Sequence, residues 1–322
     1  MKQHLLEYID RAKSTSVRGL RIMTEYFYAS EIFDPIVKSG IRIVSVFGSA
    51  RRQAGTIEYE DARKLGKLLF KNGYAVVTGA SMGIMQAANE GVADGIIEEL
   101  KKNKKFKNKN LEAITKSQEF KKKLYHSSVG LKISLPFEPV NNPWVGAYAT
   151  FHYFMIRKFF FGTLSSAFIA CEGGWGTRDE LYEMLTLVQT GKAPLMPIIY
   201  ISPDPRHLLN DLEYAVKKAY ISKDDLSLIQ VVSDYREAVK IINRFYGLVN
   251  FVDYHSRINT IDVHLVRQLT KEEEKKIINL IHGPYKNVFS EVLFARRKFE
   301  LKGFNYKSYG ILRQLIDAVT SF

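Results

Sequence analysis

The sequence contains a single cysteine, Cys171, among 322 residues. One cysteine excludes an internal disulfide bond and cannot build a metal site from several thiolates, and this scarcity is typical of a reducing compartment. Because Cys171 ends an apolar run, it is expected to be a small buried residue rather than a nucleophile. We therefore expect no metal site and no bound cofactor.

Long hydrophobic runs are also missing. The first ten residues, Met1 to Asp10, lack the apolar core behind a basic head that marks a secretory leader, and stretches such as Leu195 to Ile201 are too short to cross a bilayer. With 46% hydrophobic and 25% charged residues, the composition is that of a folded globular protein. These absences predict a soluble, cytoplasmic protein that has no membrane partner.

Positive charge is abundant but concentrated in one segment. Residues Lys101 to Lys123 contain ten lysines and two glutamates and so carry +8 of the formal net charge of +13. The aromatic residues of this segment are Phe106 and Phe120. The segment has no arginine, and base recognition usually involves arginine and several aromatic side chains. We interpret it as a solvated insertion, so a nucleic-acid partner is not expected, although salt-dependent binding through this segment is the third-ranked alternative.

The centre of the chain alternates short β-branched apolar runs with segments of helical periodicity. This alternation predicts a doubly wound, Rossmann-like α/β fold with a mostly parallel sheet. We expect a helical arm over 1–40, an α/β domain over 41–250 that includes the insertion 101–123, and a helical extension over 251–322. The expected strands are 41–47, 74–78, 131–135, 167–171, 195–201 and 229–232, and the expected helices include 59–72, 147–161 and 178–190.

Three glycine-containing turns follow predicted strands and precede predicted helices. Glycine allows close approach of the backbone to an anion, and the start of the following helix presents N–H groups and a positive dipole. None of the turns is a P-loop, because no GK[ST] follows. We expect them to hold a phosphate; their candidate residues are Gly48 and Ser49, then Gly79 and Gly83 with Met85 behind them, then Gly173, Gly174, Gly176 and Thr177.

Charged residues accompany the third turn. Thr177 and Glu180 are spaced as a capping box, which is a purely structural explanation for Glu180. Arg157 and Lys158 are adjacent cations on an apolar, aromatic predicted helix, so at least one of them is expected to face a carboxylate or a ligand.

At these residues the chain resembles the LOG ("Lonely guy") family of cytokinin riboside 5′-monophosphate phosphoribohydrolases, long labelled lysine decarboxylases. The family signature PGGxGTxxE corresponds to EGGWGTRDE, which ends at Glu180, and the Arg157-Lys158 pair lies 23 residues before that glutamate. Further stretches of similarity are GSAR, TGASMGIMQAANEG, LKISLPFEPVNNPWV, FHYFMIRK and LYEMLTLVQTGK. No motif demands the pyridoxal phosphate that a decarboxylase would need.

The resemblance implies a hydrolase that cleaves the N-glycosidic bond of a nucleoside 5′-monophosphate, such as AMP, to give free base and ribose 5-phosphate. It implies a phosphate held by the glycine turns, with Glu180, Arg157 and Lys158 as catalytic residues and an AMP nucleosidase-like activity. It also implies a homo-oligomer, at least a homodimer. Base preference, pathway and the general acid for the leaving base are not specified by the sequence.

Two departures from the family pattern bear on how the turns bind a ligand. Glu172 replaces the signature proline, and Ala80-Ser81-Met82 replaces the usual glycine and proline of the second turn. Glu172 is expected to point into solvent or to pair with a lysine. The alternative is a non-catalytic nucleotide or cofactor carrier or sensor with the same fold.

Overall fold

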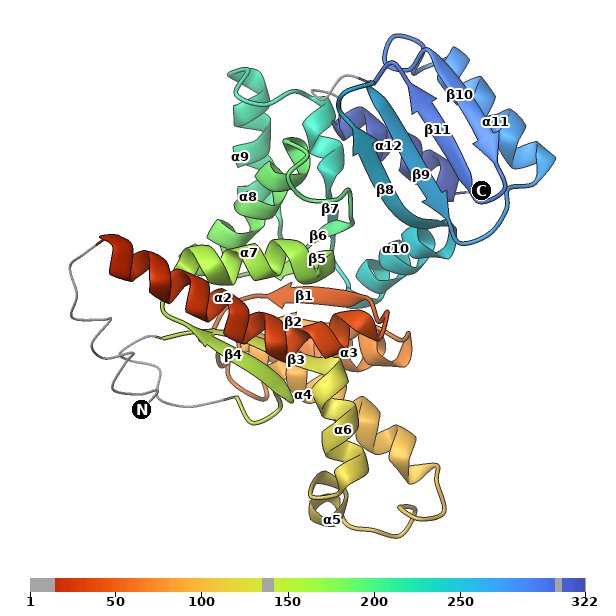
Figure 1. The fold of residues 1–322 in the computed structure, drawn as a ribbon. Coiled ribbons are helices and arrows are strands. Elements are labelled where there is room, and N and C mark those ends of the chain that lie inside the picture. Colours follow the sequence, from red (N-terminus) through yellow and green to blue (C-terminus); the bar gives the residue numbers. More distant parts are fainter. Residues whose placement is uncertain (1–14, 135–141, 305–308, 322) are drawn as a thin grey trace. The chain divides into compact units, whose positions relative to one another are not determined.

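The computed structural model describes residues 15–134, 142–304 and 309–321. It contains a seven-stranded parallel sheet flanked by helices and a four-stranded antiparallel sheet (Figure 1). The predicted doubly wound α/β fold is therefore confirmed. The chain divides into two compact units, Met1–Ser165 and Ser166–Phe322. No helix within the described ranges is long and apolar enough to cross a membrane.

The first unit holds four parallel strands in the order β4-β3-β2-β1. All residues of β1 and β2 are buried, which explains why their sequences are mostly apolar and do not alternate with polar residues. The elements of this unit are α2 (Thr15–Lys38), β1 (Ile43–Phe47), α3 (Ile57–Lys71), β2 (Ala75–Thr78), α4 (Ile84–Lys101), α5 (Leu111–Thr115), α6 (Gln118–Ser127), β3 (Ser128–Ile133), β4 (Ala147–Phe151) and α7 (Phe154–Leu164).

One expectation in this unit needs correction. The helix expected over 147–161 is in fact strand β4 followed by helix α7. The alternating burial of β4 shows that the Ala-Tyr-Ala-Thr-Phe run has strand periodicity that its helix-forming alanines obscure. Part of the LKISLPFEPVNNPWV stretch, residues 135–141, lies outside the described residues, as does the beginning of the N-terminal arm.

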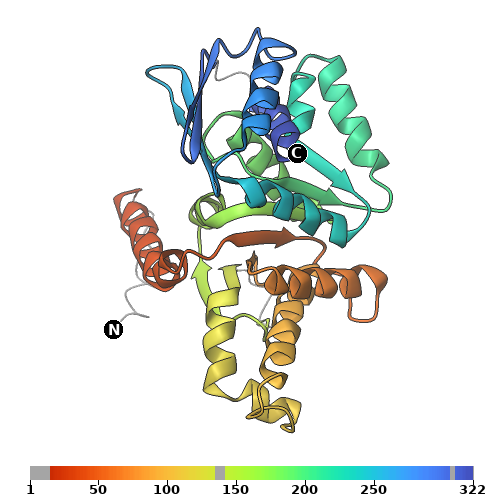
Figure 2. The same cartoon turned by 90° about the vertical axis from the view of Figure 1, so that its right-hand side faces the viewer.

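The basic insertion is folded. After α4 the chain forms α5 and α6, which lie beyond the strands of the first unit in both views (Figures 1 and 2). Its apolar side chains Phe106, Ile114 and Phe120 are each no more than 3% exposed, while most of its lysines are exposed. The lysines therefore cover a small apolar core of their own instead of lying on an extended loop.

The second unit begins with three parallel strands in the order β5-β6-β7. Its α/β part comprises β5 (Ser165–Cys171), α8 (Trp175–Gln189), β6 (Ile198–Ile201), α9 (Arg206–Lys217), the 3₁₀ helix η1 (Asp224–Leu228), β7 (Ile229–Val232) and α10 (Tyr235–Leu248). Cys171, expected to be buried, is partly exposed because it is the last residue of β5.

The C-terminal region contains helices as expected, but also a sheet that was not expected. Its elements are β8 (Val249–His255), β9 (Thr260–Leu265), α11 (Lys271–His282), β10 (Glu291–Ala295), β11 (Lys298–Lys302) and α12 (Tyr309–Thr320). The strands are antiparallel in the order β10-β11-β9-β8, and α11 and α12 lie on one face of the sheet (Figure 1).

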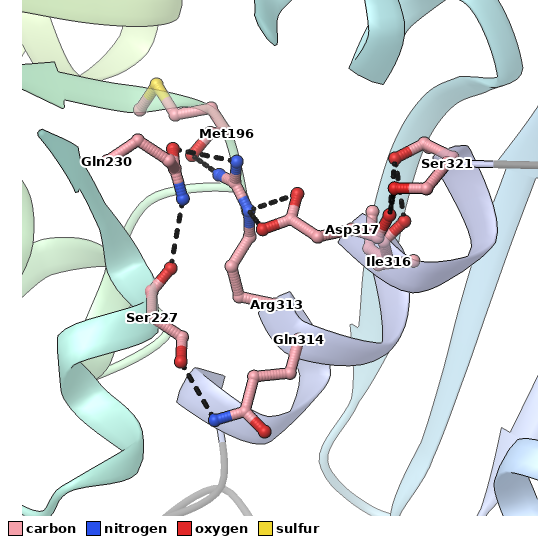
Figure 3. Close-up of polar contacts among 9 residues, drawn as sticks. Met196, Ser227, Gln230, Arg313, Gln314, Ile316, Asp317 and Ser321 are labelled. Carbon is pink, nitrogen blue, oxygen red and sulfur yellow. Dashed lines mark hydrogen bonds and ion pairs between the residues drawn. The ribbon is translucent and has the colours of Figure 1, made fainter. Parts of the chain in front are cut away.

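A buried arginine joins the two parts of the second unit. Arg313 of α12 is 0% exposed, and its guanidinium donates to the Met196 carbonyl at 2.9 Å, to Gln230 Oε1 at 2.8 Å and to the Asp317 carboxylate at 3.0 Å (Figure 3). Gln230 belongs to β7, so these bonds attach α12 to the α/β part of the unit.

Candidate functional site

The first and second glycine turns pack against each other in the first unit. Ile84 N, at the start of α4, donates to the Ser49 carbonyl at 3.1 Å. Gly83 has a φ of +70°, and a Cβ added there would lie 2.3 Å from the same carbonyl, so this position needs glycine. A Cβ on Gly48 would lie 2.5 Å from Ile84 Cγ2. The structure thus brings Gly48, Ser49 and Gly83 together at the N-terminus of α4.

A buried hydrogen-bond network supports the second turn. The Thr78 hydroxyl donates to Asn89 Oδ1 at 2.7 Å, and Asn142 Nδ2 donates to the same oxygen at 2.9 Å. Asn89 Nδ2 donates to Ser128 Oγ at 2.8 Å. The Thr78 hydroxyl also accepts from Ala80 N at 3.1 Å, and Ala80 has a φ of +56°. The network therefore holds a non-glycine residue in a left-handed conformation within the turn.

Sequence reasoning missed this network. Asn89 lies on a helix whose neighbouring residues are mostly apolar or small, and it is 0% exposed. The sequence signal for this network is an asparagine among the buried positions of a predicted helix. A buried amide group needs several hydrogen-bond partners, so such a residue indicates a buried network.

Arg157 lies beside the second turn. It is 7% exposed, and its guanidinium lies 4.9 Å from the ring centroid of Phe154 and 5.8 Å from that of Phe161. A Cβ added to Gly79 would lie 3.9 Å from Arg157 Nη1 and 3.1 Å from Met85 Sδ. Gly79, Met85 and Arg157 are therefore neighbours, whereas Lys158 is half-buried on the same helix.

The third turn lies in the second unit and starts α8 earlier than expected. The helix begins at Trp175 with Gly174 at its N-cap, and no side chain caps it. Thr177 and Glu180 are thus the third and sixth helical residues, so the expected capping box is wrong. Both are buried: Thr177 is 6% and Glu180 1% exposed. Glu180 therefore does not cap α8. It is instead a buried carboxylate about one turn inside the helix.

The glycines of this turn lie in open surroundings. A Cβ on Gly174 or Gly176 would meet no atom within 4 Å, and the Trp175 side chain between them is 93% exposed. Gly173 is half-buried, at the start of the turn. Local packing therefore does not require glycine at Gly174 or Gly176, which leaves room for a ligand against the backbone.

Glu172 is neither free in solvent nor paired with a lysine, so that expectation is wrong. Its carboxylate accepts a hydrogen bond from the Ser202 hydroxyl, and Ser202 is 1% exposed at the end of β6. Ser202 Oγ also accepts from Asp204 N at 3.0 Å. Burial, with the nearby negative charge of Glu172, raises the pKa of Tyr200 to about 12. The carboxylate that replaces the signature proline is therefore fixed toward β6.

The arrangement within each unit suits anion binding. Helices α4 and α8 have 18 and 15 residues, and each has a glycine at its N-cap and no side-chain cap. Such termini present backbone N–H groups and a positive dipole end to an anion. Within residues 15–134, 142–304 and 309–321, no group of three or more His, Cys, Asp or Glu side chains is arranged to hold a metal ion.

Comparison with known proteins identifies the family of the chain. The family described as "Possible lysine decarboxylase" matches residues 79–242. A curated "Bifunctional cytokinin biosynthesis protein" of Fusarium pseudograminearum is 25% identical over 234 residues, which cover 71% of this chain and 46% of that protein. The chain thus spans about half the length of the curated relative that it matches.

Solved structures with a similar fold include two molybdenum cofactor proteins. The molybdenum cofactor binding protein of Rippkaea orientalis is 18% identical, with a TM-score of 0.40 over 63% of this chain and 96% of that chain. The molybdenum cofactor carrier protein of Chlamydomonas reinhardtii is 17% identical, with a TM-score of 0.39 over 63% and 97%. With sequence identities and TM-scores this low, the similarities do not bear on function.

Proposed function

We propose that this chain, which belongs to the LOG family described as possible lysine decarboxylases, is a hydrolase that cleaves the N-glycosidic bond of a nucleoside 5′-monophosphate. The substrate is AMP or a modified AMP, and the products are free base and ribose 5-phosphate. The observation that carries the proposal is Glu180, a carboxylate buried one turn behind the open glycines of the family signature.

The proposed roles follow from local structure in each unit. The backbone N–H groups of Gly173, Gly174 and Gly176, with the Thr177 hydroxyl, bind the 5′-phosphate, because they form the uncapped start of α8. Ser49, bonded through its carbonyl to the start of α4, assists in phosphate binding. In this proposal these groups bind the monophosphate, and the buried charged side chains Glu180 and Arg157 act in bond cleavage.

Glu180 is the proposed group at the ribose. A buried carboxylate stabilises the positive charge that develops on C1′ as the C1′–N bond breaks, and it orients the attacking water. Water then supplies the hydroxyl on C1′ and a proton for the departing base. Arg157 fixes the carboxylate or the substrate, and Lys158 assists it; the cation–π contacts of Arg157 with Phe154 and Phe161 hold its guanidinium in one orientation.

The first experiment is incubation of the purified protein with a panel of nucleoside 5′-monophosphates, with chromatographic detection of free base and ribose 5-phosphate. We expect cleavage of at least one purine nucleotide. Glu180→Gln and Arg157→Ala are each expected to lower kcat by at least about 100-fold while the circular dichroism spectrum stays unchanged, because both groups act on developing charge.

Glu213→Gln is the matched control, because Glu213 is an exposed glutamate on α9. Full turnover by Glu180→Gln would contradict the assigned role. Nucleotide-dependent stabilisation without base release from any nucleotide would replace the proposal with the carrier or sensor function, with Glu172 as the first residue to substitute.

A further inference from the structure

Helix α7, which carries Arg157, is capped by another helix. Its N-cap residue Tyr153 provides no side-chain cap. Instead, the Glu25 carboxylate of α2 accepts hydrogen bonds from two backbone N–H groups. His152 N donates to both carboxylate oxygens at 3.1 Å, and Tyr153 N donates to Oε2 at 3.3 Å. A carboxylate at this position satisfies backbone donors that the helix itself cannot pair and complements the positive end of the helix dipole.

The capping group is buried and oriented. Glu25 and Arg21 are each 8% exposed, and Arg21 Nε donates to Glu25 Oε1 at 3.1 Å. The Arg21 guanidinium also lies 5.9 Å from the centroid of the Tyr153 ring. A buried ion pair contributes little net stability, but it fixes the direction of both side chains. Glu25 therefore holds the start of α7 at a defined place against α2.

Further contacts tie α2 to the same part of the first unit. Phe33 and Tyr26 of α2 contact the Phe160 ring of α7, with ring centroids 5.7 and 5.6 Å apart. The Tyr125 hydroxyl donates to the Ile32 carbonyl at 2.9 Å. The Phe33 and Ile32 contacts lie about two turns of α2 away from Glu25. Helix α2 therefore stays attached to the first unit when the cap alone is removed.

Arg157 lies in the turn that the cap orders. Its N–H donates to the Tyr153 carbonyl at 3.4 Å, so the residue capped by Glu25 also accepts the hydrogen bond of the Arg157 backbone. The guanidinium then reaches the second glycine turn next to Gly79. A shift of the first turn of α7 would be transmitted directly to that guanidinium, and small displacements of catalytic groups are costly.

We propose that Glu25 of the N-terminal helix is a positioning residue, which sets the place of Arg157 for catalysis by capping α7. This inference rests on the proposed function. It assigns the N-terminal arm, which lies outside the similarity to the family, a part in the reaction. It also predicts that a ligand or modification that moves α2 changes turnover through Arg157.

The test compares Glu25→Ala, Glu25→Gln and the control Glu31→Ala, an exposed acid on the same helix. Loss of a helix cap is expected to lower kcat of Glu25→Ala about tenfold, with KM nearly unchanged. Glu25→Gln keeps one acceptor oxygen and should recover part of the loss. In an Arg157→Lys background the Glu25→Ala effect should shrink, because residues that act through one another are not additive.

Amide hydrogen exchange over residues 152–157 provides a readout independent of turnover. Exchange should be faster in Glu25→Ala and unchanged in Glu31→Ala. Unchanged exchange, or faster exchange with full kcat, overturns the inference, as does a fully additive effect in the Arg157→Lys background. If the wild-type chain releases no base, the proposed function fails, while the exchange rates still decide whether Glu25 holds α7.

Discussion

The buried residue Arg313 shows how one charged side chain contributes to the stability of the second unit. Arg313 satisfies a carbonyl, an amide oxygen and a carboxylate at once, and its guanidinium lies 5.4 Å from the Phe245 ring centroid (Figure 3). Removing the guanidinium leaves those acceptors buried without their donor, which costs more than the bonds themselves contribute.

We therefore expect Arg313→Met to lower the free energy of unfolding by about 3 kcal/mol, since breaking a buried charge pair from one side typically costs this much. Urea denaturation monitored by circular dichroism measures it. Arg236→Ala removes an exposed pair with Asp234 and serves as the control, with an expected loss of at most about 1 kcal/mol. Equal losses for the two variants would show that burial does not set the difference.

At this scale, sequence reasoning identified residue types better than residue partners. The glycine turns, Arg157 and Glu180 could be singled out because their chemistry is local. The partners of Glu172, Asn89 and Glu25 could not, because each bond joins residues that are 30 or more positions apart, or lie on different elements. Hydrogen-bond partners across such distances depend on the packed fold.

Among the elements, α11 has an N-terminus that is capped by two side chains. Thr270 and Glu273 form a reciprocal capping box, and Arg267 binds the Glu273 carboxylate with nitrogen–oxygen distances of 2.6 and 2.9 Å. The hydrogen bonds from Arg267, followed by those from Thr270, lower the pKa of Glu273 to about 2 from its usual value near 4.5. This helix carries a pH-dependent part of the stability.

A depressed carboxyl pKa stabilises the folded state above the unfolded pKa and loses that contribution as the pH falls through the folded pKa. The Glu273 contribution should thus be complete above pH 4.5 and decline toward pH 2. Because the Arg267 side chain is 50% exposed, solvent screens its interaction with Glu273. The contribution of Glu273 to the free energy of unfolding should therefore amount to about 1–2 kcal/mol. Unfolding free energies of Glu273→Gln measured between pH 7 and 3 should show a weaker pH dependence than those of the wild type; identical slopes would refute this assignment.

The elements predicted from the sequence were those with a strong local pattern. The central strands have continuous apolar runs because both of their faces are buried, and their existence was predictable. Strands β8 to β11 were missed although the burial in β11 alternates along the strand, because the helical spacing of residues 277–281 dominated that region. Their pairing depends on a two-residue hairpin connection and on the helices that cover the sheet.

At the scale of the whole molecule, we expect a homodimer. Apolar side chains of α2 and α7 remain exposed in the first unit: Leu20, Met23, Phe27, Met155 and Phe159 are between 49% and 60% exposed. Clustered exposed apolar residues mark interaction surfaces. Phe27→Glu should shift the dimer to a monomer in light scattering, whereas Leu111→Glu on α5 should not. A monomeric wild-type protein would contradict the expectation.

The exposure of Trp175 has a practical consequence for spectroscopy. The chain contains two tryptophans, and Trp144 is half-buried whereas Trp175 stands in water between two glycines of the proposed phosphate turn. An indole in water emits at longer wavelength than one in an apolar environment and is open to collisional quenching by iodide. The chain therefore carries its own fluorescent reporter at this turn, and occupancy of the turn can be followed in a cuvette without any label.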